Sequence, residues 1–158
     1  DRETAQLMRE RGAFAVPTQV TYEMLAEHGA RYGLPADSVA KIEDVRLAGR
    51  RALEFFAEAG VPMGYGSDLL GEMHEYQTQE LRIRAEVLRN LEALRSATSV
   101  AARILEREGE LGCIAAGALA DLLVVDGDPL TDISCLVGQG ERLDVILQGG
   151  RLVKNRLG

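Results

Sequence analysis

A carboxylate that follows a short apolar run in the middle of the chain is the strongest candidate for chemistry. The run Val61–Tyr65 leads through glycines to Ser67 and Asp68. If the run is a strand of a parallel sheet, Asp68 lies at its carboxyl end, where barrel enzymes place their catalytic groups. A carboxylate there can ligate a metal ion or accept a proton from a water that the metal activates. The same pattern is equally typical of a residue that caps a helix or turn, and the spacing does not choose between the two.

Histidines are too few for a complete metal site. His74 follows Asp68 in the same loop, and His28 lies in a segment of helical pattern, where we expect a surface position. Because zinc takes three or four protein ligands, the two histidines rule out a multi-histidine site built from this chain alone. The chain also lacks the Gly-x-Ser-x-Gly, phosphate-loop and dinucleotide-binding motifs.

Alternating helices and buried strands are predicted to position these residues. The apolar run Ala13–Thr18 does not alternate, which predicts a strand buried on both faces, and Val61–Tyr65 predicts a second one. Helices are predicted at residues 2–11, 22–32, 36–59 and 77–96, with a further short helix after Thr98. The apolar stripe of the third helix is predicted to consist of Val39, Ile42, Val45, Ala48, Ala52, Phe55 and Phe56. Helices that end at glycines and lead into strands are typical of a parallel sheet or barrel.

The last third of the chain has a different character. Residues 119–126 are rich in β-forming residues, and Gly149–Gly150 separates two further apolar runs, which indicates a hairpin. Two or three strands are too few for a sheet of any depth, so we expect them to pair with strands from elsewhere.

Composition and charge limit the class of partner. The 158 residues are 46% hydrophobic and 27% charged, which is ordinary for a globular protein, and the net charge is −7. A negative charge argues against nucleic acid and anionic membranes, and no apolar run reaches the ~20 residues that span a bilayer. The two cysteines, Cys113 and Cys135, are too few for a disulfide framework, which favours reduced thiols and a cytoplasmic location. A small-molecule substrate is the expected partner.

Several motifs in this chain form a specific combination. They are Gly66-Ser67-Asp68, the helix start at Ala97-Thr98, the run Gly112–Asp126 with its Ala-Asp-Leu and Val-Val-Asp segments, Pro129-Leu130 and the closing run Val145–Lys154. Together they resemble the carboxyl-terminal part of a metal-dependent amidohydrolase. The similarity is closest to the imidazolonepropionase-like branch, which includes zinc-dependent Xaa-Pro dipeptidases, and it covers nearly the whole chain.

The resemblance implies an α/β fold, a distorted (β/α)8 TIM-like barrel beside a small β-sandwich. On this mapping, residues 1–108 form the final βα units of the barrel, with Phe14–Thr18 as its seventh strand and Met63–Ser67 as its eighth. Residues 109–158 supply strands of the sandwich. The implied cofactor is zinc, as one or two ions, with other divalent metals as alternatives.

The resemblance also implies an activity and roles for single residues. The family hydrolyses the amide or peptide C–N bond of a small substrate, for which a dipeptide or an N-acyl amino acid is the first expectation here. Asp68 matches the residue that ligates the metal and carries the proton from the attacking water to the leaving amine. Ser67, His74 and Tyr22 are expected to bind substrate, and Gln19 and Thr21 lie on the same rim. For His74 the alternative is a loop histidine that orders Asp68 or faces solvent.

The departures from the family pattern are also large. The His-x-His of the first strand, the bridging lysine and the histidines of the fifth and sixth strands have no counterpart here. We therefore expect this chain to be inactive by itself, as part of a longer enzyme. The alternative function is a non-catalytic fragment or assembly module. Open strand edges and apolar helix faces predict a homo-oligomer or a missing amino-terminal segment.

Overall fold

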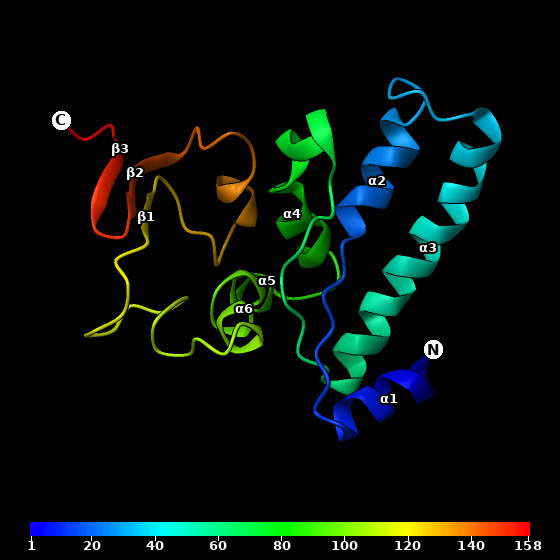
Figure 1. Ribbon diagram of the computed structural model, residues 1–158, viewed down its shortest axis with the longest axis horizontal. Coiled ribbons are helices and arrows are strands. Elements are labelled where there is room, and N and C mark those ends of the chain that lie inside the picture. Colours follow the sequence, from blue (N-terminus) through cyan, green and yellow to red (C-terminus); the bar gives the residue numbers. More distant parts are fainter.

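The computed structural model describes residues 1–158, and helices make up most of its regular structure, with a small sheet at one end (Figure 1). In chain order the elements are α1 (Arg2–Glu10), α2 (Gln19–His28), α3 (Ala36–Ala59), the 3-10 helix η1 (Gly71–Tyr76), α4 (Gln79–Ala85), α5 (Asn90–Ala97), α6 (Ser99–Ile104), β1 (Leu122–Val125), the 3-10 helix η2 (Ile133–Leu136), β2 (Leu143–Gln148) and β3 (Arg151–Asn155). Figure 1 shows α1, α2 and α3 at one end, the sheet at the other, and α4, α5 and α6 between them.

The two predicted buried strands lie side by side and run parallel. The Ala15 amide donates to the Pro62 carbonyl over 3.0 Å, and the Gly64 amide donates to the Ala15 carbonyl over 2.8 Å. These bonds form a single parallel bridge between Ala15 and Met63. The predicted parallel pairing is therefore confirmed at one rung. The barrel itself is not formed, because the chain's only sheet is the one built from β1, β2 and β3.

The apolar core gathers around this bridge. One cluster of buried residues consists of Ala5, Ala15, Leu53, Val61 and Met63, and so joins α1, α3 and both parallel segments. A second cluster, of Val20, Met24, Leu69, Met73 and Ile83, joins α2, η1 and α4 beside the segment that carries Asp68. Close packing in these clusters fixes the course of the chain before and after the bridge.

The predicted long helix at residues 77–96 is wrong, because the chain forms α4 and α5 with a turn between them. In that turn the Leu88 amide donates to the Arg84 carbonyl over 2.7 Å. Val87 and Leu88 pack against the core cluster around Leu53 and Val61. A continuous helix would hold these two side chains in another direction, so we attribute the break to the apolar area that they bury.

The predicted apolar stripe of α3 is only partly correct. Phe55 and Phe56 pack against the core cluster as predicted, but Val45 is 45% exposed. The one buried residue of the helix is Leu53. The phase is shifted because the contact between α3 and α2 is polar: Arg46 and Arg50 of α3 both pair with Glu23 of α2.

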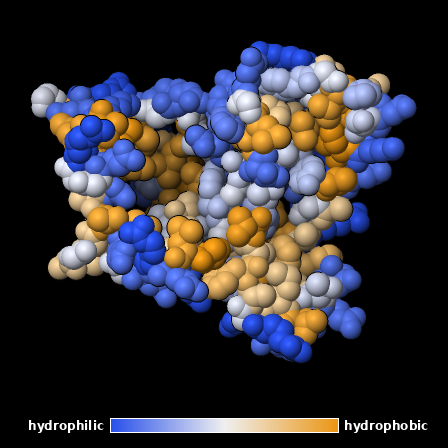
Figure 2. Space-filling model, in the orientation of Figure 1, coloured by the Kyte–Doolittle hydropathy of each residue, from blue (hydrophilic) through white to orange (hydrophobic).

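The end of the chain forms an antiparallel sheet in the order β1-β2-β3. The hairpin predicted at Gly149–Gly150 is confirmed, with Gln148 paired to Arg151. Apolar residues of this sheet, among them Leu123 and Leu152, are about half exposed, and Figure 2 shows apolar surface at this end of the molecule. The second layer that a sandwich requires is not present among these residues. None of the helices has the length and apolar character that crossing a bilayer requires.

The junction between the helices and the tail predicts a large effect for one small substitution. Gly112 has φ 66°, and a Cβ added there would lie 2.4 Å from the Thr98 carbonyl oxygen. Gly109 has a similar φ of 82° but open space around it. Gly109→Ala should therefore cost about 1–2 kcal/mol through its backbone conformation alone. Gly112→Ala should cost at least about 1 kcal/mol more, because the Thr98 backbone must move. Chemical denaturation of both variants measures the difference, and equal losses would show that this contact is not close in solution.

Candidate active site

Asp68 lies at the end of the second parallel segment, with its carboxylate free. The residue is exposed, and the carboxylate forms no hydrogen bond or ion pair within the chain. Its φ of 52° is left-handed, a conformation that only Asp68 and Glu106 adopt among the non-glycine residues. The helix-cap alternative is not realised, since η1 begins after Leu70 without a side-chain cap. Left-handed backbone at a non-glycine residue costs free energy and is enriched at functional sites.

Ser67 and Thr21 connect the ends of the two parallel segments. The hydroxyl of Thr21, near the start of α2, donates to the Ser67 carbonyl. Thr21 is buried, while Ser67 is half-buried. The residues that follow the two parallel segments are therefore in direct contact, and the barrel rim expected there stays a prediction.

His74 contacts the same loop just after Asp68. Its Nε2 lies 2.6 Å from the Leu69 carbonyl oxygen. A carbonyl oxygen only accepts, so Nε2 carries the proton and Nδ1 remains for another partner. This contact agrees with the alternative in which the histidine orders the segment around Asp68. It leaves the predicted contact with substrate possible through Nδ1 only.

Tyr22, the third residue predicted to bind substrate, lies next to Thr21 on α2 and is half-buried. Ser67 precedes Asp68 and His74 contacts the Leu69 carbonyl, whereas Tyr22 forms no hydrogen bond with this loop. Their roles towards a substrate remain predictions.

A buried ion pair behind this rim was not predicted from the sequence. Glu80 and Arg84 of α4 are fully buried, and Arg84 Nε donates to Glu80 Oε1 over 2.8 Å. Glu80 Oε2 accepts from the Val20 amide over 2.7 Å, and Arg84 Nη2 donates to the Pro17 carbonyl over 2.7 Å. Burial raises the pKa of Glu80 to about 7, while Arg84 and the Val20 amide act in the opposite direction. The Glu-to-Arg spacing of four is visible in the sequence as a helix pair. Its burial is not, because the residues that cover it are distant in the chain.

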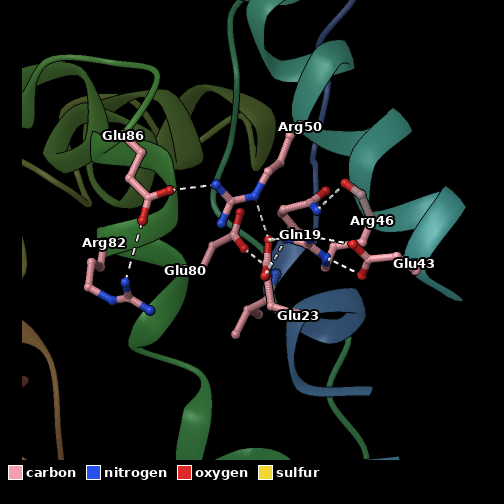
Figure 3. A network of polar contacts seen from close by, with 9 residues as sticks. Gln19, Glu23, Glu43, Arg46, Arg50, Glu80, Arg82 and Glu86 are labelled. Atoms are coloured by element: carbon pink, nitrogen blue, oxygen red, sulfur yellow. Dashed lines mark hydrogen bonds and ion pairs between the residues drawn. The ribbon is translucent and has the colours of Figure 1, made fainter. Parts of the chain in front are cut away.

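Further charged residues link α2, α3 and α4 close to Glu80 (Figure 3). Glu23 of α2 pairs with Arg46 at 3.1 Å and with Arg50 at 2.6 Å. Arg50 also forms an ion pair of 2.7 Å with Glu86, which lies just beyond the end of α4. Gln19 adds a hydrogen bond of 2.8 Å to the Arg46 carbonyl. Partly exposed pairs of this kind each contribute little stability, so we read them as fixing the orientation of α2 between α3 and α4.

These residues can supply one ligand to a metal ion, but they do not form a complete metal site. No group of three or more His, Cys, Asp or Glu side chains is close enough to hold a metal ion. Asp68 is a free carboxylate, which suits one ligand position. A cavity of about 440 Å³ lies beside Val61 and Leu88, at the start of the parallel segment, and Asp68 does not line it. A metal ion and an enclosed substrate pocket at Asp68 would therefore both need further polypeptide.

Comparison with known proteins gives a consistent result. The amidohydrolase family matches residues 1–152. A solved prolidase in complex with N-methylphosphonate-L-proline is 59% identical, with a TM-score of 0.93 over 98% of this chain and 38% of that one. A Xaa-Pro dipeptidase with methionine bound in its active site is 29% identical, with a TM-score of 0.83 over 98% of this chain and 38% of that one. Ochratoxinase from A. niger is 27% identical, with a TM-score of 0.79 over 98% of this chain and 35% of that one. None of the curated proteins matches. The chain thus spans well under half the length of these structures.

Proposed function

This chain belongs to the amidohydrolase family, and from that premise we propose that it forms part of a metal-dependent enzyme that cleaves the C–N bond of an Xaa-Pro dipeptide. Other dipeptides and N-acyl amino acids are the neighbouring substrate class. The observation that carries the proposal is the 59% identity to a prolidase over 98% of the chain. Family membership and the likeness to prolidases confirm the resemblance inferred from the sequence motifs.

In this proposal, residues 1–108 contribute the last βα units of a (β/α)8 barrel and residues 109–158 contribute strands of a β-sandwich. The parallel bridge between Ala15 and Met63 supports the first assignment, since it joins the segments expected as the seventh and eighth strands. The exposed apolar residues of the tail sheet support the second. The remaining barrel strands and metal ligands would come from polypeptide outside these 158 residues.

Asp68 is the residue of this chain that acts in the reaction. Zinc, as one or two ions, would supply the usual chemistry of this class by lowering the pKa of a bound water to near neutrality. Asp68 provides one carboxylate ligand. Because its carboxylate has no partner in the chain, an oxygen remains free to accept the proton of the attacking water. Asp68 then delivers this proton to the amine that leaves, as a general acid.

Ser67, His74 and Tyr22 are proposed to bind the substrate. The Tyr22 hydroxyl and His74 Nδ1 are polar groups without a partner in the chain and suit the polar ends of a dipeptide. Ser67 offers its hydroxyl beside Asp68, while its carbonyl is already bound by Thr21. A site built from these groups would select a small substrate by its charge and its length.

A hydrolysis assay tests the proposal. The purified protein that contains this chain is incubated with Xaa-Pro dipeptides, with dipeptides that lack proline and with N-acyl amino acids, before and after removal of metal by a chelator. We expect hydrolysis of the Xaa-Pro substrates, a loss of at least about 100-fold on chelation, and recovery with Zn²⁺. Full activity of the metal-free protein would overturn the proposal, as would failure to hydrolyse any of the three classes.

The second candidate is a module that assembles without catalysing. Its motive is the incomplete donor set around Asp68, together with the exposed apolar residues of the tail sheet. It predicts a homo-oligomer, or a stable complex with a separate polypeptide, without metal-dependent turnover. The same assay, combined with the measured mass of the assembly, distinguishes the two candidates. The free thiols of Cys113 and Cys135 support a reducing, cytoplasmic location for either one.

A further inference from the structure

We propose that Glu80 and Arg84 are positioning residues for Asp68, and that Thr21 transmits their effect. The pair fixes the turn between Pro17 and Val20, and Thr21 then fixes the peptide unit that precedes Asp68. This inference rests on the proposed role of Asp68 and adds residues that do not contact the substrate.

The last step concerns the peptide between Ser67 and Asp68. The Thr21 hydroxyl binds the Ser67 carbonyl, which belongs to the same planar unit as the Asp68 amide. Fixing the direction of that carbonyl therefore fixes the plane from which Asp68 continues. Asp68 has a φ of 52°, which is left-handed and not the backbone's preferred state. Without the Thr21 bond, the peptide can rotate to relieve this strain and redirect the carboxylate.

The preceding step concerns the start of α2, which carries Thr21. This helix has no side-chain cap of its own, since Thr18 at its amino terminus forms no capping hydrogen bond. Glu80 of α4 caps the helix instead, because its Oε2 accepts from the Val20 amide over 2.7 Å. A carboxylate at a helix amino terminus also interacts favourably with the helix dipole. The position of Thr21 therefore depends on a residue that is 60 positions from Val20 in the chain.

Arg84 completes the arrangement from the other side of the turn. Its Nη2 donates to the Pro17 carbonyl over 2.7 Å, and its Nε donates to Glu80 over 2.8 Å. The planar guanidinium holds both acceptors at a fixed angle, which a lysine cannot reproduce. Its Cζ also lies 5.5 Å from the centre of the Tyr65 ring, two residues before Ser67. One buried side chain thus contacts both parallel segments just below the rim.

A pair of variants at Thr21 tests the transmission step. Thr21→Val keeps the shape and removes the hydroxyl, while Thr21→Ser keeps the hydroxyl and removes a methyl group. We expect Thr21→Val to lower kcat by roughly 10- to 100-fold, with the Tm of the folded protein and KM little changed, because small displacements of a reacting group have effects of this size. Thr21→Ser should keep most of the kcat of the wild type. A purely structural role would move Tm and leave the kcat of the folded protein intact.

Glu80→Gln in the full protein tests the support from α4. The amide can still accept from Val20 but places an NH₂ group towards Arg84, so we expect a kcat lower by about 10-fold or more. In the double variant with Thr21→Val the losses should be less than multiplicative, since both act through the same peptide. Arg82→Gln, on the exposed side of the same helix, is the control and should keep its kcat.

The outcomes separate this inference from the proposed function. If Asp68→Asn lowers kcat by about 100-fold or more while folded Thr21→Val retains the kcat of the wild type, the positioning inference is overturned and the proposed function stands. If Asp68→Asn retains full turnover, the proposed function fails first. Should Glu80→Gln not fold, the comparison of Thr21→Val with Thr21→Ser still decides.

Discussion

Replacing Asp68 by asparagine is expected to lower kcat for dipeptide hydrolysis by about 10²- to 10⁴-fold, the range typical of a positioned acid–base group. The amide cannot accept the proton of the attacking water and is a poorer ligand for a divalent ion. Asparagine tolerates left-handed backbone about as well as aspartate, so the φ of 52° at this position should persist and Tm should change little. The measurement is kcat and bound metal per protein, taken together with Tm.

The matched control for this variant is Glu72→Gln. Glu72 is also exposed and lies in the first turn of η1, four positions from Asp68, so its loss removes the same charge from the same loop. We expect kcat within about twofold of the wild type, because water and salt weaken the effect of a single exposed charge. An Asp68→Asn enzyme with unchanged kcat, or a Glu72→Gln enzyme with an equal loss, would remove the special role of Asp68.

Arg84→Met is expected to cost far more stability than a matched substitution on the exposed side of α4. It leaves the Glu80 carboxylate buried without its cation, and breaking such a pair typically costs about 3–5 kcal/mol. Arg82→Met on the same helix is the control. Arg82 is about half exposed, and its ion pair with Glu86 is longer, at 3.4 Å. That pair should be worth less than about 1 kcal/mol. Chemical denaturation gives both values, and similar losses would show that the buried pair is not formed in solution.

The pH dependence of Arg84→Met provides an independent check. Burial raises the pKa of Glu80 to about 7 from the ordinary 4.5, so the folded state binds more protons than the unfolded state between these values. The contribution of Glu80 to stability is therefore present at low pH and is lost as the pH rises through about 7. Without Arg84 the pKa rises further, and the loss continues to higher pH. The Tm difference between Arg84→Met and the wild type should thus be larger at about pH 8 than at about pH 6. A difference that shrinks with pH would contradict this assignment.

Local patterns in the sequence predicted the elements that carry the site. The apolar runs before Thr18 and before Ser67 predicted two parallel segments, and the structure joins them at Ala15 and Met63. Gly149–Gly150 predicted the hairpin in the same way, because a turn is specified by the residues within it. The family followed from the motifs around Asp68 and the tail. The left-handed backbone of Asp68 was not predicted, since aspartate signals it only weakly.

Features that depend on distant contacts were not predicted. The start of α2 at Gln19 was missed because its cap comes from Glu80, on another helix. The break between α4 and α5 was missed because Val87 and Leu88 turn towards a core formed by other helices. Periodicity within one segment contains neither of these contacts. The residues missed in this way include the pair that we propose to position the site.

The most direct test of the central claim is a crystal structure of the full protein with zinc, with anomalous diffraction recorded at the zinc absorption edge. We expect an anomalous peak about 2.0–2.2 Å from a carboxylate oxygen of Asp68, the ordinary zinc–carboxylate distance. The other ligands should come from polypeptide outside these 158 residues. An active enzyme whose zinc lies out of reach of Asp68, or which binds no metal at all, would contradict the assignment of Asp68 as metal ligand and proton carrier.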